Sequence, residues 1–259
     1  MDIFQAIVMG IVEGLTEFLP ISSTGHMILV GHFLGIEQES DFVKTFEVAI
    51  QLGSILAVIF VLHQKLLKGL GVWVKLAIGF VPTGLIGFLA YKYIKDFFHP
   101  QMVAYMLIIG GFVFLWIELR DKSAAYKKQN LEEISYKEAF IVGLCQSLAM
   151  IPGTSRSGAT IVAGLLMGFS RTLAAEFSFM LAIPTMVAAT GYDVYKNLGV
   201  FNMDNLGILL IGGVVAFITA LFSIKVFLGF VSRFSYVPFG IYRIILGGLV
   251  LFYFWSVNA

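Results

Sequence analysis

Apolar residues run in long, unbroken stretches along this chain, and short clusters of charged residues separate them. Six stretches have about the 20 residues that an α-helix needs to cross the hydrocarbon core of a bilayer. The pattern therefore predicts membrane-spanning helices, at residues 43–63, 72–94, 101–119, 174–195, 206–230 and 238–256.

Two further apolar regions, residues 3–35 and 137–170, are each interrupted near the middle. Pro20-Ile-Ser-Ser-Thr-Gly breaks the first region, and Pro152-Gly-Thr-Ser-Arg-Ser-Gly breaks the second. Each half has about a dozen residues, which is too short to cross a membrane at about 1.5 Å per residue. We interpret both regions as re-entrant helix-loop-helix hairpins, whose irregular loops must face protein or a water-filled cavity.

The two interrupted regions resemble each other when the sequence is displaced by 133 residues. Residues of the same type then coincide: Gly10 with Gly143, Ser22 with Ser155, and Gly25 with Gly158. Each half holds one hairpin and three spans, and an odd number of crossings places the halves in opposite orientations. We expect an all-α integral membrane protein with an inverted-topology repeat, made of residues 1–119, a cytoplasmic linker at 120–136, and residues 137–259.

The composition excludes a soluble globular protein. Hydrophobic residues make up 59% of the chain and charged residues 13%, against about 45–50% and about 25% in ordinary soluble domains. The net charge of +1 gives no reason to expect a nucleic-acid partner. The sequence leaves a homodimer open.

Basic residues are divided unevenly between the two ends of the predicted spans. Ten lie at the end nearest the linker and four at the other end. The positive-inside rule places the first end in the cytoplasm. Both termini and the mouth of the first hairpin then face the outer side of the membrane.

Glu13 and Glu17 lie four residues apart in an otherwise apolar segment, so a helix carries both carboxylates on one face. Ionisable groups at membrane depth are costly and usually functional, and two adjacent carboxylates need a proton or a cation between them. We expect Glu13 and Glu17 to bind a divalent metal, Mg²⁺ or Ca²⁺. The alternative is a solvated pair near the headgroup boundary.

Hydroxyl-rich segments follow both interruptions and open new half-helices, whose N-termini favour anions. His26, close behind Ser23, could act as a general base or donate to an oxyanion. Arg156 offers a planar fork that matches phosphoryl oxygens, although it could instead reach cytoplasmic headgroups. The other candidate phosphate ligands are Ser22, Thr24, Ser155, Ser157 and Thr160.

These groups together suit phosphoryl transfer, which needs a nucleophile in line and positive charge around the phosphoryl oxygens. A chain without a soluble domain points to a lipid phosphate or diphosphate as the substrate. Three residues of the spans are weaker candidates to line the site: Glu47, Gln51 and Arg243. Arg243 could alternatively extend to the outer surface, and we expect Glu176 to face the interface.

Glu13-Gly-Leu-Thr-Glu-Phe-Leu-Pro-Ile-Ser-Ser-Thr-Gly-His26 and Pro152-Gly-Thr-Ser-Arg-Ser-Gly-Ala-Thr160 resemble the two signature motifs of the undecaprenyl-diphosphatase family, also called bacitracin resistance proteins. The resemblance implies an enzyme of the bacterial inner (plasma) membrane that hydrolyses undecaprenyl diphosphate to undecaprenyl phosphate and inorganic phosphate. Such an enzyme recycles the carrier lipid of cell-wall synthesis and confers resistance to bacitracin. It depends on a divalent cation, and its site opens to the outer, periplasmic side.

The resemblance assigns roles residue by residue. Glu13 and Glu17 hold the metal or polarise the nucleophile, Arg156 binds the diphosphate, and His26 is the acid or base beside Ser23. Ser155, Ser157 and Thr160 donate to phosphoryl oxygens. Ser23, His26 and water all remain open as the nucleophile. The rival interpretation is a transporter or flippase of a polyprenyl phosphate or another anion, since inverted repeats and broken helices are typical of secondary transporters.

Overall fold

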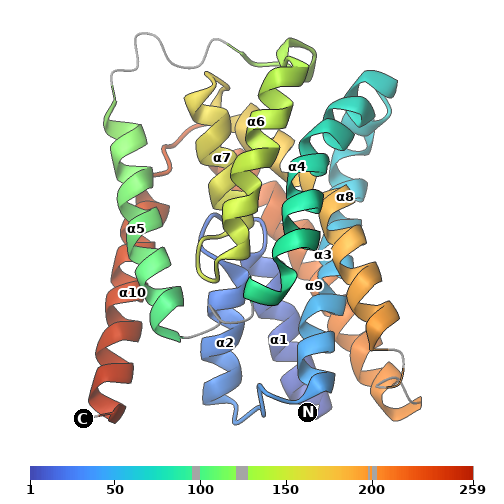
Figure 1. Ribbon diagram of the computed structural model, residues 1–259, viewed down its shortest axis with the longest axis vertical. Helices are drawn as coiled ribbons and strands as arrows, with labels where there is room; N and C mark the ends of the chain where they lie inside the picture. The colour runs from blue at the N-terminus through green and yellow to red at the C-terminus, as the bar shows by residue number, and fades with distance from the viewer. Residues whose placement is uncertain (95–99, 121–127, 198, 200–202, 259) are drawn as a thin grey trace.

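The computed structural model describes residues 1–94, 100–120, 128–197, 199 and 203–258, and over these residues the fold is all-helical (Figure 1). The helices are α1 (Ile3–Thr16), α2 (Ser23–Phe33), α3 (Asp41–Leu66), α4 (Leu70–Ile94), α5 (Pro100–Leu119), α6 (Tyr136–Gln146), α7 (Arg156–Leu166), α8 (Arg171–Lys196), α9 (Met203–Val231) and α10 (Val237–Asn258). Two short 3₁₀ helices, η3 (Leu131–Glu133) and η4 (Ser147–Met150), precede and follow α6.

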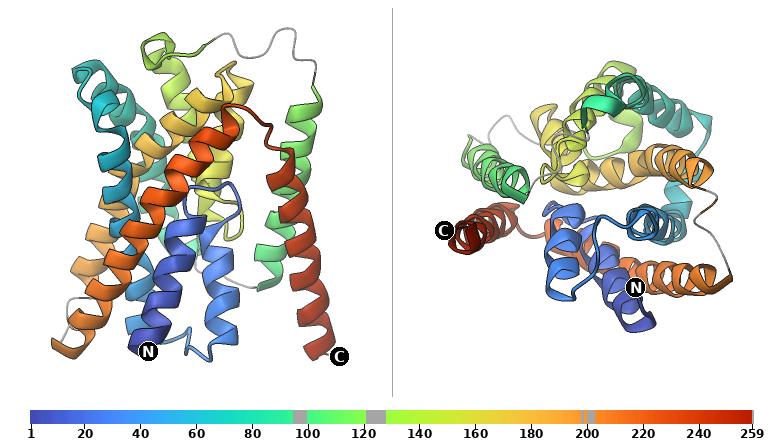
Figure 2. Two further views of the ribbon diagram at one scale, coloured as in Figure 1. Left: turned by 180° about the vertical axis from the view of Figure 1, so that it is seen from behind. Right: turned by 60° about the horizontal axis from the view of Figure 1, so that its bottom comes forward.

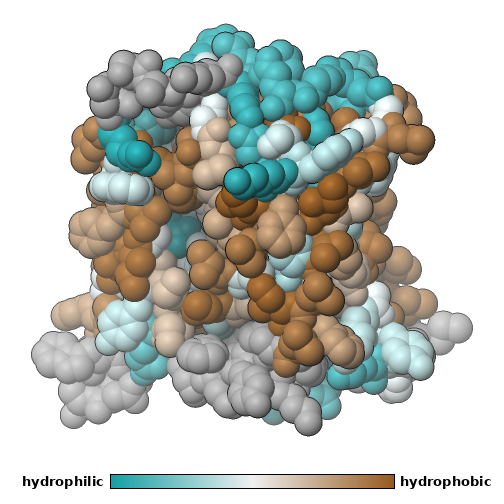
Figure 3. Space-filling model, turned by 45° about the horizontal axis from the view of Figure 1, so that its top comes forward, coloured by the Kyte–Doolittle hydropathy of each residue, from teal (hydrophilic) through white to brown (hydrophobic). Residues whose placement is uncertain are grey.

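Five helices in the described part of the chain are long and apolar enough to cross a membrane: α3, α4, α5, α8 and α9. The sixth expected span, 238–256, falls within α10, which is apolar over Val237–Tyr253; the side chains of 254–256 lie outside the described residues. Figure 3 shows an apolar band around the sides and hydrophilic side chains gathered at the end where α6 begins. The prediction of an all-α, multi-pass membrane protein is confirmed.

The two interrupted regions form hairpins that enter from opposite ends of the helix bundle. α1 and α2 lie at the end that holds both termini, whereas α6 and α7 lie at the other end (Figures 1 and 2). Their loops meet near the middle, where the Ser157 hydroxyl donates to the Leu19 carbonyl at 3.0 Å. The half-helices therefore end inside the protein, as the proline interruptions predict.

Ser22 and Ser155 give the two loops the same local geometry. Each has φ of +71°, and no other non-glycine residue in the described ranges has a positive φ. Each hydroxyl caps the half-helix that follows, by accepting from the amide of Gly25 or Gly158. A non-glycine residue in this conformation costs about 1–3 kcal/mol, so both loops hold strain where the half-helices begin.

Paired glycines bring the hairpins against the long helices. Gly10 of α1 lies so close to α9 that a Cβ would sit 2.6 Å from the Gly212 carbonyl oxygen, and Gly143 of α6 contacts the backbone of Gly79 in α4 in the same way. Close backbone approach through small residues is the usual way in which helices pack within membranes. These contacts fix the position of α1 and α6, and with them the position of both loops.

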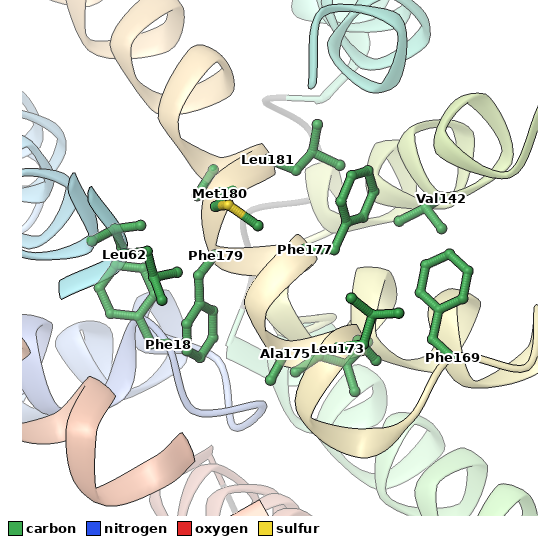
Figure 4. Packing of buried hydrophobic residues seen from close by; sticks show 14 of the residues in the cluster. Phe18, Leu62, Val142, Phe169, Leu173, Ala175, Phe177, Phe179, Met180 and Leu181 are labelled. Carbon is green, nitrogen blue, oxygen red and sulfur yellow. The ribbon is translucent and has the colours of Figure 1, made fainter. Parts of the chain in front are cut away.

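The core is centred on α8, whose large side chains project in several directions (Figure 4). Phe179 meets Phe18 of the first hairpin edge-on, with 5.0 Å between the ring centroids. Phe177 similarly packs against Phe169, just before α8. Because α8 contacts both hairpins, it provides a rigid support for the loops.

Candidate functional site

Glu17 connects the two hairpins. Its Oε1 accepts a hydrogen bond from Nη2 of Arg156 at 2.8 Å, and its Oε2 accepts from the hydroxyl of Ser23. Glu17 is 7% exposed and lies directly after α1, whereas Arg156 begins α7. The structure thus brings together three of the residues that the sequence singled out.

Arg156 points into the protein rather than to a headgroup. Its Nη1 donates to the Ser178 carbonyl of α8 at 3.0 Å, and its guanidinium lies 5.7 Å from the centre of the Phe18 ring. Nε is buried and has no hydrogen-bond partner among the described residues. The guanidinium is therefore held in place with its Nε–H still available.

Glu13 is fully buried, and neither of its carboxylate oxygens has a hydrogen-bond partner within the described part of the chain. Its charged neighbours are Glu17, Glu47 and Arg156, and the hydroxyl of Ser54 in α3 also lies near. An unpaired buried carboxylate is costly, so this position calls for a cation or a proton.

The carboxylates at Glu13 and Glu17 fit a hard cation that takes further oxygen ligands from the substrate of the protein. The described residues contain no cluster of three or more His, Cys, Asp or Glu side chains that could hold a metal without other ligands. Mg²⁺, however, is commonly bound by one or two carboxylates together with substrate phosphate oxygens. Glu13 and Glu17 could supply such a pair.

His26 has partners that the sequence did not indicate. Nδ1 lies 2.8 Å from the Ser22 carbonyl oxygen, and Nε2 lies 2.7 Å from the hydroxyl of Tyr242 in α10. A carbonyl can only accept, so the hydrogen-bond network assigns the proton to Nδ1, and Nε2 of the neutral ring accepts from Tyr242. In this structure the hydroxyl of Ser23 donates to Glu17 rather than to His26.

The hydroxyls of the second loop are engaged within the protein. Ser155 caps α7, Ser157 binds the Leu19 carbonyl, and Thr160 lies 2.6 Å from the Ser178 hydroxyl. By contrast, the hydroxyl of Thr154 is buried and has no partner among the described side chains and backbone groups. Sequence reasoning passed over Thr154, although it lies inside the motif at 152–160.

In the first loop, Ser22 is buried as the cap of α2, and Thr24 is half-buried in the first turn of that helix. On α3, Glu47 and Gln51 are both partly buried, and Oε1 of Glu47 has no partner among the described residues. The expectation for Glu176 was wrong. It is 7% exposed and pairs with Lys65 of α3 at 2.5 Å, because α8 turns this face toward α3 rather than toward the membrane surface.

Arg243 is fully buried and does not extend to the outer surface. Its guanidinium donates to backbone carbonyls of both loops, Pro20 in the first and Gly153 and Thr154 in the second, at 3.0–3.1 Å. Further bonds reach the carbonyls of Met106 and Leu107 in α5. Arg243 thus fastens the two loops to each other and to α5.

A cavity of about 520 Å³ opens beside the site between α1, α9 and α10. Its walls are mainly leucine, valine and phenylalanine side chains, and Tyr242 forms part of one wall. Since Tyr242 also binds His26, the cavity adjoins the polar groups of the hairpin loops.

Comparison with known proteins gives one consistent result. Residues 6–249 match the family described as bacitracin resistance protein BacA. The undecaprenyl-diphosphatase of Wolinella succinogenes is 60% identical over 98% of this chain and 98% of its own length. The undecaprenyl-diphosphatase of Campylobacter fetus is 62% identical, and that of Persephonella marina is 55% identical. Both matches cover 98% of this chain and 99% of the relative's length. The chain belongs to the bacitracin resistance protein BacA family.

Proposed function

We propose that this chain hydrolyses undecaprenyl diphosphate to undecaprenyl phosphate and inorganic phosphate. The observation that carries the proposal is the connection from Ser23 through Glu17 to Arg156, which joins a hydroxyl, a carboxylate and a guanidinium from two hairpins inside an apolar protein. The family and its relatives named undecaprenyl-diphosphatase support the choice of substrate. The activity would recycle the carrier lipid and give resistance to bacitracin.

Ser23 is the nucleophile that this geometry favours. Its hydroxyl already donates to Glu17, which can therefore take the proton as the oxygen attacks the terminal phosphorus. A bond forms between the Ser23 oxygen and phosphorus, the bond from phosphorus to the bridging oxygen breaks, and undecaprenyl phosphate leaves. Glu17 passes the serine proton to the leaving oxygen and is ionised again. Water then attacks the phosphoserine and gives a proton to Glu17, and Glu17 returns that proton to the Ser23 oxygen as phosphate is released.

Positive charge for the diphosphate comes from both hairpins. Arg156 has an unused Nε donor, and α2 and α7 point their N-termini toward the meeting loops. Such helix starts attract anions through their free amides and their dipoles. Both ring nitrogens of His26 are hydrogen-bonded within the protein, so a proton that His26 exchanges with a phosphoryl or leaving oxygen would pass through the Tyr242 hydroxyl.

Glu13 and Glu17 would hold the divalent cation, Mg²⁺ or Ca²⁺, together with oxygens of the substrate. When bound, the cation would neutralise charge that develops on the phosphoryl oxygens. The unpaired oxygens of Glu13 support this assignment, because the described residues give them no hydrogen-bond donor.

We propose that the two halves of the chain, residues 1–119 and 137–259, form an inverted repeat. Ser22 and Ser155 share an unusual conformation 133 residues apart, and the contacting glycines repeat at the same interval, Gly10 with Gly212 and Gly143 with Gly79. The excess of basic residues near the linker supports a topology with that end in the cytoplasm. The site then opens to the outer side of a bacterial inner membrane.

The test is phosphate release by purified protein in detergent from undecaprenyl diphosphate, with and without EDTA. Glu17→Gln keeps the size of the side chain but removes both the base and the partner of Arg156, so we expect a loss of at least about a hundredfold in kcat. Glu39→Gln, an exposed position on the outer side of the proposed topology, is the matched control. Unchanged turnover in a folded Glu17→Gln protein would contradict the proposal.

The transporter interpretation predicts a different result in the same assay. A transporter or flippase of polyprenyl phosphate releases no inorganic phosphate, whatever metal is added. Absence of release from folded wild-type protein would therefore favour transport over hydrolysis.

A further inference from the structure

The cavity of about 520 Å³ has the chemistry of a hydrocarbon site. Leu15 and Leu19 line it from the first hairpin, and Phe222, Val226 and Phe227 line it from α9. Its volume lies within the range of about 300–1,000 Å³ that small-molecule sites usually have. It is large enough for part of an extended apolar chain, whereas the rest of a long chain would lie in the membrane.

Tyr242 belongs both to the cavity and to the polar site. Its ring lines the cavity, and its hydroxyl lies 2.7 Å from Nε2 of His26. Tyr242 is 42% exposed, so a molecule in the cavity can contact the ring directly. A molecule that contacts the Tyr242 ring can therefore change the position of the hydroxyl that binds His26.

The backbone around the cavity is held in place. The Ser223 hydroxyl donates to the Leu15 carbonyl at 2.9 Å and fixes α9 against α1. The residue after Tyr242 is Arg243, which binds carbonyls of both loops. Tyr242 can therefore respond to the contents of the cavity only by rotation of its side chain.

We infer that this cavity receives the first isoprene units of the substrate, and that Tyr242 is a positioning residue through which a bound chain orients His26. The inference rests on the proposed function. A polyprenyl chain is the occupant that fits, because the cavity is apolar and is continuous with the polar site through Tyr242, and because the substrate joins hydrocarbon to diphosphate. A substrate whose chain fills the cavity holds the Tyr242 ring in place and so keeps its hydroxyl on His26.

Two substitutions separate binding of the chain from orientation of the histidine. Tyr242→Phe keeps the ring but removes the hydroxyl, so kcat for undecaprenyl diphosphate should fall about tenfold with little change in KM. Val226→Trp fills the cavity, so KM should rise about tenfold with kcat nearly unchanged. Val214→Trp, at a position of α9 that is 57% exposed and outside the cavity lining, should alter neither constant.

The measurement is steady-state phosphate release in detergent, with thermal unfolding and size exclusion recorded for every variant. An unchanged KM in Val226→Trp would overturn the assignment of the cavity and indicate a membrane lipid as its occupant, or a second copy if the oligomeric state also changes. An unchanged kcat in Tyr242→Phe would overturn the positioning role. If folded wild-type protein releases no phosphate, the proposed function itself fails and this inference fails with it.

Discussion

Glu17 and Arg156 form an ion pair of 2.8 Å between hairpins that enter from opposite ends of the protein, 139 residues apart in the chain. The pair is largely buried, with 6% of the Glu17 side chain and 12% of the Arg156 side chain exposed. Breaking a buried pair by removing one partner typically costs about 3–5 kcal/mol. Loss of either partner would therefore leave an uncompensated charge between the two loops, and the pair also presents a guanidinium where the diphosphate is proposed to bind.

Arg156→Lys tests whether the fork of the guanidinium matters beyond its charge. A lysine ammonium is a point charge and cannot reproduce the bonds to both Glu17 and the Ser178 carbonyl. We expect kcat/KM for phosphate release to fall about a hundredfold. Arg233→Lys, an exposed arginine after α9, is the control and should keep full activity. If the activity of Arg156→Lys were within twofold of wild type, the two-pronged geometry of the guanidinium would not matter beyond its charge.

Ser23→Ala tests the nucleophile. The substitution removes the attacking oxygen, so phosphate release should fall to the background rate, and wild-type protein quenched in acid during turnover should carry phosphoserine at Ser23. The labelled residue can be located by mass spectrometry. Ser232→Ala removes an exposed hydroxyl that bonds only locally, to the Gly229 carbonyl, and serves as the control. Single-step inversion at a chiral phosphorus would instead assign the attack to water.

Glu13→Gln tests the proposed cation site. Glutamine keeps one carbonyl oxygen but loses the negative charge, so half-maximal activity should require about tenfold more Mg²⁺ or Ca²⁺. EDTA should abolish the activity of the wild type and excess metal should restore it. A metal titration identical to that of the wild type would place the cation, or the proton, elsewhere.

Arg243→Met tests how far one side chain holds the loops together. The change leaves buried carbonyls in both loops and in α5 without their donor, and each such loss costs about 1–3 kcal/mol. We expect Tm in detergent to fall by at least about 6 °C, and phosphate release to be lost with it. Arg243→Lys should recover part of both, because an ammonium satisfies some of the carbonyls. An unchanged Tm in Arg243→Met would contradict this account.

Gly143→Ala tests the close contact between α6 and α4. A Cβ at this position would collide with the backbone of Gly79, and overpacking of this kind costs about 1–3 kcal/mol. Tm should therefore fall by several degrees. Gly248→Ala in α10 is the matched control, because a Cβ there meets no atom within 4 Å and should leave stability unchanged or slightly raised.

Local features of the sequence predicted local structure well. Pro20 and Pro152 interrupt their apolar regions, and the half-helices end near them, while Ser22 and Ser155 act as caps as their residue type suggests. These outcomes depend only on neighbouring residues and on the cost of irregular backbone in an apolar setting. The helix class and the membrane setting follow from the same information.

Partners far apart in the chain could not be predicted in this way. The bond from His26 to Tyr242 spans 216 residues, and no spacing rule connects them. Arg243 binds backbone carbonyls, which every residue has, so sequence could only indicate that a buried arginine needs partners. Glu176 was misplaced for the same reason: its pairing with Lys65 depends on how α8 rotates against α3.

The carbonyls that Arg243 binds lie in the first loop, in α5 and in the second loop, and all of them are synthesised before α10. A nascent chain can thus insert nine helices of the described fold and still lack the residue that fastens its loops. The loops gain this donor only once residue 243 has been synthesised. A chain that stops before residue 243 would therefore be inserted but inactive. Catalysis would have to wait until synthesis is nearly complete.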